Sequence, residues 1–249
     1  MQSQFPIHHH VHRMGARASR LIVTCLILIS LFFGFSSAGE TPADGSWPVT
    51  GTDDQGVAIT LDHPPQRIVS LAPSNTELLF ALGLDDRIAG VTDYCDYPNS
   101  AALKEKIGGF STVSLEKVTA LKPDLIVASE GNNPDTVERL RTLGFPVFLV
   151  DCTSMEDILS TLETLGTLTG RSEQASRLIQ ELKERSDTVR VQGAELSRHP
   201  TVAHVVWNDP LYVSGGGTFQ DELIRISGGV NAFADKDSHQ IVGVEEFLS

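Results

Sequence analysis

The chain has 249 residues, with 19 lysines and arginines against 32 acidic residues and a formal net charge of −13. This length allows one large domain or two small lobes, each able to bury a core. An acidic surface argues against nucleic acid or an anionic membrane as a partner.

The first 38 residues have the features of a secretory signal peptide. Arg13, Arg17 and Arg20 precede an uncharged apolar run over residues 21–35, and small residues then lead to Ala38. The run is shorter than the ~20 residues that a membrane-spanning helix needs. We therefore predict cleavage near Ala38, which removes three of the basic residues, none of the acidic ones, and leaves a net charge of −16.

Two cysteines, Cys95 and Cys152, remain after this cleavage. An oxidising compartment permits a disulfide between them. They follow different strands that need not be neighbours, however, and a disulfide requires Cα atoms within about 7 Å. We therefore expect two unpaired thiols, and their spacing is not that of a metal site.

Residues 39–154 are predicted to form an α/β lobe that is entered through a β-hairpin over residues 49–61. Apolar, β-branched runs then alternate with amphipathic segments, which indicates a parallel sheet with right-handed crossovers. The expected strands are 68–71, 88–92, 125–128 and 147–150, and the expected helices are 75–82, 114–122 and 134–143.

The stretch 67–98 predicts a binding face. Ser74 and Glu77 fit a capping box at the start of the first helix. The loops 72–75 and 92–97 both follow strands, and in open α/β sheets ligands bind outside the carboxyl ends of the strands.

Residues 155–197 carry helical periodicity without strands, over 155–169 and 172–196, and are predicted to be linker helices. A second lobe is expected over 198–249, with a strand at 201–206, an aromatic, glycine-rich loop at 207–217 and a helix at 219–226. The pattern at Ser114–Val118 recurs in outline at Gly243–Phe247 without a following strand, so we expect this lobe to be incomplete at its C-terminus.

Four groups of residues together form a recognisable set of motifs: Leu71–Leu78, Asp96–Pro98, Ser114–Glu116 with Leu121–Asp124, and Asp209–Gly215. In their order and spacing they resemble the class III periplasmic binding proteins, and among them the cobalamin-binding proteins that serve an ABC importer. The resemblance extends over about 47–249, and it implies two α/β lobes with parallel sheets, joined by a long helix, with the ligand held between them.

The resemblance implies roles for particular residues. The ligand would lie against Pro73, Ser74, Tyr94, Phe110, Trp207, Tyr212 and His239, the last of which stands where cobalamin binders often have tryptophan. Glu116 and Glu245, one in each lobe, would dock on arginines of the membrane permease subunits.

Simpler interpretations exist for most of these residues. The aromatic side chains could be ordinary core residues, and Glu116 in a first helical turn is also explained by the helix dipole. Asp93 and Asp96 fit turn-capping roles better than ligand contact.

Two other classes of function find less support in the sequence. His63, His199, His204 and His239 could indicate a divalent-metal chaperone, but a metal site needs three or four converging ligands, and these histidines fall on separate elements. An enzyme is not indicated, because residues 214–217 are rich in glycine but lack the lysine of a P-loop, and no nucleophile elbow is present.

The resemblance, together with the signal peptide, therefore implies a monomeric periplasmic solute-binding protein, without a resident cofactor or metal, that delivers cobalamin or another corrinoid to an ABC importer. A ferric siderophore or haem is the alternative ligand. The loops 72–75, 92–98 and 208–217 contain no lysine or arginine, which favours a near-neutral ligand over an anionic one.

Overall fold

The computed structural model describes residues 47–248, so the predicted signal peptide lies outside the described residues. Within this range, no helix is long and apolar enough to cross a membrane.

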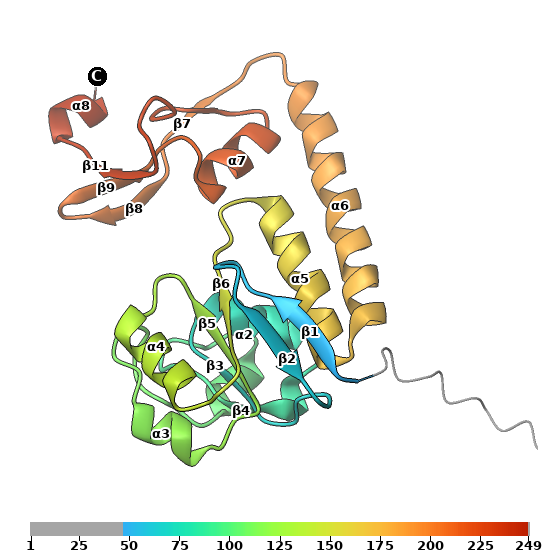
Figure 1. Ribbon diagram of the computed structural model, residues 1–249. Helices are drawn as coiled ribbons and strands as arrows, with labels where there is room; N and C mark the ends of the chain where they lie inside the picture. Colours follow the sequence, from blue (N-terminus) through green and yellow to red (C-terminus); the bar gives the residue numbers. More distant parts are fainter. Residues whose placement is uncertain (1–46, 249) are drawn as a thin grey trace, which may run out of the picture. The chain divides into compact units, whose positions relative to one another are not determined.

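A four-stranded parallel sheet forms the centre of the N-terminal lobe (Figure 1), in the order β4-β3-β5-β6. The four strands are those predicted from the sequence, to within two residues at each end. They are β3 (Ile68–Ser70), β4 (Ile88–Gly90), β5 (Leu125–Ser129) and β6 (Val147–Val150).

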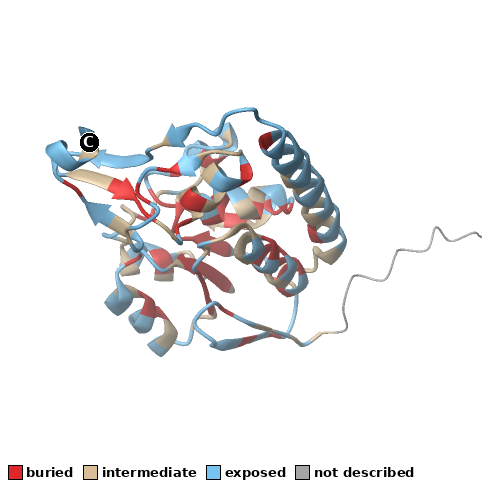
Figure 2. Ribbon diagram, turned by 90° about the horizontal axis from the view of Figure 1, so that it is seen from above, coloured by how far each residue is buried: buried red, intermediate tan, exposed pale blue. Residues whose placement is uncertain are grey.

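Alternate residues of these strands supply two cores on the two faces of the sheet. Val127 and Phe148 pack on one face against leucines of α5 (Met155–Thr169), and Ile126 and Leu149 pack on the other. Burial on both faces explains why these strands are continuously apolar, and Figure 2 shows them as the most buried part of the lobe.

The helices of this lobe are α2 (Pro73–Ala81), α3 (Leu115–Ala120) and α4 (Pro134–Thr142), with short 3-10 turns at η1 (Asp85–Arg87) and η2 (Asn99–Leu103). The predicted capping box at Ser74 is wrong. The N-cap of α2 is Ala72, without a side-chain cap, and Pro73 is the first helical residue. Proline fits there because the first helical N–H has no partner within the helix.

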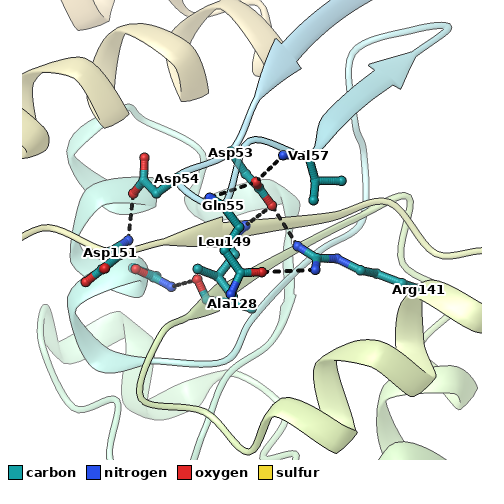
Figure 3. A network of polar contacts seen from close by, with 9 residues as sticks. Asp53, Asp54, Gln55, Val57, Ala128, Arg141, Leu149 and Asp151 are labelled. Carbon is teal, nitrogen blue, oxygen red and sulfur yellow. Dashed lines mark hydrogen bonds and ion pairs between the residues drawn. The ribbon is translucent and has the colours of Figure 1, made fainter.

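The predicted hairpin is formed by β1 (Val49–Thr52) and β2 (Ala58–Leu61), which pair antiparallel. Its turn is fastened to the lobe by polar contacts that Figure 3 shows. The carboxylate of Asp53 accepts from Arg141 of α4, and that of Asp54 accepts from the backbone N–H of Asp151, just after β6.

Two helices link the lobes, as predicted: α5 and the 23-residue α6 (Ser172–Ala194). Ser154 caps α5, and Gly170, with φ of 68°, ends it. Leu178 and Leu182 of α6 pack against the N-terminal core, whereas Val189, two turns farther along the helix, is 41% exposed.

The described part of the C-terminal lobe contains a parallel pair, β10-β7, and a three-stranded sheet in the order β11-β9-β8. Its elements are β7 (Thr201–Val202), β8 (Val205–Asn208), β9 (Leu211–Ser214), α7 (Phe219–Ile226), β10 (Val230–Asn231), β11 (His239–Ile241) and α8 (Val244–Leu248).

The three-stranded sheet departs from the prediction in two ways. Residues 207–217 were expected to be a loop, but Asp209 and Pro210 form a two-residue turn between β8 and β9. A turn this short can join only antiparallel strands, so this sheet is antiparallel, and the expected parallel pairing holds only for β7 and β10.

Candidate functional site

A cavity of about 820 Å³ lies at the carboxyl ends of β5 and β6, beside the first turn of α2. Residues from the C-terminal lobe complete its wall, so the cavity lies between the two linked lobes. Its lining consists of Ser74, Asn75, Glu77, Leu78, Ser129, Glu130, Gly131, Val150, Asp151, Cys152, Thr153, Ile158, Phe219, Ser238 and His239.

Two buried asparagines hold the loops that form the floor of this cavity. Asn75 of α2 donates to the carbonyl oxygen of Ala128, at 2.9 Å, which fixes the start of α2 against β5. Asn132 accepts from the N–H of Ser129 at 2.7 Å and donates to the carbonyls of Leu71 and Phe110, both at 2.9 Å. One amide thus joins the loops that follow β3 and β5 to the segment that contains Phe110.

The wall that follows β6 is shaped by Asp54 and Cys152. The Asp54 carboxylate accepts from the Asp151 N–H at 2.6 Å, and burial raises the pKa of Asp54. The Cys152 thiol lies 3.4 Å from the Thr161 hydroxyl, and burial raises the pKa of this thiol above its usual value. Both described cysteines are unpaired, as predicted.

The cavity wall combines apolar surface with negative charge. Leu78, Val150, Ile158 and Phe219 supply aliphatic and aromatic surface. The three charged groups are the carboxylates of Glu77, Glu130 and Asp151, and the described lining contains no lysine or arginine. The site is therefore suited to a ligand with a large apolar surface and no excess negative charge.

Two of the seven predicted ligand residues, Ser74 and His239, line this cavity. The ring of His239 lies against that of Tyr212, tilted by 32°, with ring centroids 5.8 Å apart. Phe110 packs over Gly131, where an added Cβ would lie 2.8 Å from its ring. Tyr212 and Phe110 therefore do not line the cavity themselves, but each contacts a residue that does.

The remaining predicted residues lie elsewhere on the same elements. Pro73 begins α2. Tyr94 is 66% exposed on the loop after β4, and Trp207 is 63% exposed on β8, where its indole N–H donates to the carbonyl of Asp209 at 2.9 Å. The structure thus leaves these aromatic side chains available to contact a ligand, although the residues that line the cavity do not include them.

Phe219 and Asn132 were missed by reasoning from the sequence. Phe219 is the first residue of α7 and follows Thr218, whose side chain caps that helix. The glycine-rich segment just before Thr218 was the feature of the sequence that could have pointed to Phe219. Asn132 follows β5 within the sequence Glu130-Gly131-Asn132, which ends a buried strand and could have been recognised by the same rule that identified the loop 72–75.

The two predicted docking glutamates both lie exposed in the first turn of a short helix. Glu116 is the second residue of α3, which Ser114 caps by accepting from the Lys117 N–H at 3.3 Å. Glu245 is the second residue of α8.

The four candidate histidines, His63, His199, His204 and His239, do not converge. His199 lies 2.7 Å from the carbonyl of Gly228, and His204 lies 2.9 Å from the hydroxyl of Ser214. Among residues 47–248, no group of three or more His, Cys, Asp or Glu residues is placed to hold a metal ion.

Comparisons with known proteins agree with this architecture. The model of the family described as "Periplasmic binding protein" matches residues 68–249. The vitamin B12-binding protein of Yersinia pestis (strain Pestoides F) is 37% identical over 171 residues, which cover 68% of this chain and 61% of that protein. The chain thus spans less than two thirds of the length of such curated relatives.

Solved structures show the same fold. The periplasmic vitamin B12 binding protein BtuF of Vibrio cholerae is 32% identical, with a TM-score of 0.67 over 74% of this chain and 73% of that chain. The periplasmic heme-binding protein RhuT from Roseiflexus sp. RS-1 is 26% identical, with a TM-score of 0.66 over 73% of this chain and 72% of that chain. With its two α/β lobes and linker helices, the chain belongs to the periplasmic binding protein family.

Proposed function

We propose that this protein is a solute-binding protein that captures cobalamin or a related corrinoid and delivers it to an ABC importer. The observation that carries this proposal is the lining of the 820 Å³ cavity, which is apolar and acidic and has no lysine or arginine among its described residues. The names of the relatives in Yersinia pestis and Vibrio cholerae, both vitamin B12-binding proteins, support the same choice.

The charge of the cavity separates corrinoids from the alternative ligands. Corrinoids carry neutral amide groups around their macrocycle, whereas haem carries two carboxylates and ferric siderophores are commonly anionic. An anionic ligand would face Glu77, Glu130 and Asp151 with no cation of the lining to balance it. A neutral amide can instead donate hydrogen bonds to these carboxylates.

Delivery requires a surface that the importer can recognise in both lobes. The exposed carboxylates of Glu116 and Glu245 meet this requirement, because each lies in the first turn of a helix on a different lobe. We infer that they dock on arginines of the permease subunits, that the protein acts as a monomer, and that the segment 1–38 directs it to the periplasm before cleavage.

Titration calorimetry tests the ligand assignment. The chain is titrated with cyanocobalamin, haemin and a ferric hydroxamate, and we expect tight binding of the corrinoid with little dependence on salt, because apolar contacts dominate. Tight binding of haemin or the hydroxamate without binding of any corrinoid overturns the proposal. Stoichiometric zinc or manganese in the purified protein would instead support a metal chaperone.

A matched pair of tyrosines tests the role of the aromatic loop after β4. Tyr94 and Tyr97 are each 66% exposed on this loop, but only Tyr94 is a predicted ligand residue. Tyr94→Ala should weaken corrinoid binding by about 1–3 kcal/mol if its ring stacks on the ligand, and Tyr97→Ala should leave it unchanged. Equal effects of the two changes would remove Tyr94 from the site.

A further inference from the structure

His239 lies at the cavity wall beside a second aromatic ring. It begins β11, where it pairs with Ser214 of β9, while Tyr212 of β9 pairs with Ile241. His239 and Tyr212 are therefore diagonal neighbours on one face of the sheet. Their rings lie 5.8 Å apart with an interplanar angle of 32°, and His239 is half-buried and lines the cavity.

The imidazole of His239 differs from the other described histidines in its hydrogen bonding. His63, His199 and His204 each have a ring nitrogen 2.7–3.4 Å from a carbonyl or hydroxyl oxygen. Neither ring nitrogen of His239 has a hydrogen-bond partner among residues 47–248, although the ring is packed on Tyr212. A partly buried imidazole with a free nitrogen beside a cavity is suited to bind a metal centre that a ligand brings in.

The other donor of comparable softness in the lining is Cys152. A thiol must lose its proton to bind a metal well. The Cys152 sulfur is close to the Thr161 hydroxyl and half-buried, and burial raises the pKa of this thiol, which keeps it protonated at neutral pH. The remaining charged donors are carboxylates, which prefer harder ions. Of the groups that line the cavity, the imidazole is thus the best matched to the cobalt of a corrinoid.

We propose that a ring nitrogen of His239 is an axial ligand to the cobalt of the bound corrinoid. This inference rests on the proposed function, since it requires a corrinoid in the cavity. The step is a ligand exchange: the bond between cobalt and an axial water breaks, a bond from the neutral imidazole nitrogen to cobalt forms, and the water leaves. The oxidation state of cobalt does not change, and no proton is transferred. The protein therefore prefers corrinoids with an exchangeable axial water over those with a firmly held axial group.

Aquocobalamin and cyanocobalamin form a matched pair of probes, because they differ in one axial group. We expect the full chain to bind aquocobalamin at least tenfold more tightly than cyanocobalamin. The absorption spectrum of bound aquocobalamin should shift as it does when free imidazole is added to aquocobalamin in solution, and the spectrum of bound cyanocobalamin should not change.

Three variants assign the ligand. His239→Phe keeps a ring against Tyr212 but has no nitrogen, so it should abolish both the spectral shift and the preference. His204→Gln is the control, since His204 bonds to Ser214 outside the cavity lining, and it should retain both. Loss of the shift in Cys152→Ser but not in His239→Phe overturns the inference.

The outcomes separate this inference from the proposed function. If both corrinoids bind equally well and without a spectral shift, His239 is not a cobalt ligand, while corrinoid capture stands. If neither corrinoid binds, the proposed function fails, and the inference fails with it.

Discussion

The guanidinium of Arg141 in α4 lies 2.7 Å from the carboxylate of Asp53, whose side chain is completely buried in the turn between β1 and β2. The same carboxylate accepts from the backbone N–H groups of Gln55 and Val57, at 3.0 and 2.8 Å (Figure 3). This pair attaches the entry hairpin to the helix that follows β5, so the hairpin is part of the N-terminal lobe and not an appendage.

Arg141→Ala should reduce the free energy of unfolding by about 2–4 kcal/mol, because it leaves a buried carboxylate without its cation. The matched control is Arg177, whose guanidinium lies 2.6 Å from Glu173 while both side chains are exposed. Arg177→Ala should cost less than about 0.5 kcal/mol, as exposed pairs usually do. Urea unfolding measures both, and similar losses would show that burial does not strengthen the pair with Asp53.

A close backbone contact at the end of α6 gives a second prediction. A Cβ on Gly193 would lie 2.7 Å from the backbone nitrogen of Gly228, which follows α7 and has φ of 82°. Backbone atoms on both sides leave no flexible group to move away. Gly193→Ala should therefore destabilise the protein by about 1–3 kcal/mol, although alanine is the better helix former.

Gly243→Ala is the control for this change, since a Cβ there has no neighbour within 4 Å. It should alter the midpoint of thermal unfolding little. A Gly193→Ala protein as stable as the parent would mean that α6 and the segment after α7 separate readily.

Much of the N-terminal lobe could be predicted because its strands are buried on both faces. The runs at Ile68–Ser70 and Val147–Val150 have no polar residue facing solvent, so their composition alone indicates parallel strands. In the C-terminal lobe, β8 is exposed along its whole length. Its sequence therefore carries no burial pattern. The hairpin with β9 could not be predicted either, because the sequence of the turn at Asp209 is also typical of an ordinary loop.

Reasoning from the sequence indicated where the candidate site lies better than it indicated which residues line it. The rule that ligands bind at the carboxyl ends of strands led to the edge of the sheet where the cavity lies, and Ser74 of the predicted loop 72–75 is among the lining residues. Asn75 could not be assigned its role, because its hydrogen bond to the Ala128 carbonyl joins residues 53 positions apart. Phe219 enters the lining only through the arrangement of the two lobes, which no local pattern encodes.

Asp157, in the first turn of α5, makes a pH-dependent contact with the residue that precedes the cap, because its carboxylate accepts from the N–H and the hydroxyl of Thr153. Burial alone would raise the pKa of Asp157, but hydrogen bonds from Ser154 and Thr153 together hold it below its usual value. The carboxylate is thus the form that the folded state favours. Its stabilisation is present above about pH 4, the usual aspartate pKa, and is lost as the pH falls through the lower value in the folded protein.

Asp157→Asn should therefore lower stability at pH 7 by about 0.5–1 kcal/mol, a modest effect because the group is largely solvated. The difference from the parent should shrink as the pH falls below 4. The neighbouring Glu156 is exposed in the same turn, so Glu156→Gln controls for the loss of one charge. A deficit in Asp157→Asn that stays constant down to pH 3, followed by urea unfolding, would contradict the assignment.

The docking of the importer can be tested by charge reversal on each lobe. Glu116 and Glu245 are exposed, lie on different lobes, and are not among the residues that line the cavity. Glu116→Lys and Glu245→Lys should therefore leave corrinoid affinity within about twofold, since exposed charges away from a site act weakly. Each should sharply reduce stimulation of the importer's ATPase, and the double variant should nearly abolish it, because charge-assisted pairs fix the orientation of the complex.

Glu163→Lys makes the same change of charge on an exposed position of α5, so it separates docking from a general effect of net charge. It should stimulate the ATPase as the parent does. Loss of ligand binding in Glu116→Lys would instead place this residue in the binding cleft. If both reversed proteins support normal transport, the two glutamates only stabilise the first turns of α3 and α8, where a negative charge is favourable at the positive end of the helix dipole.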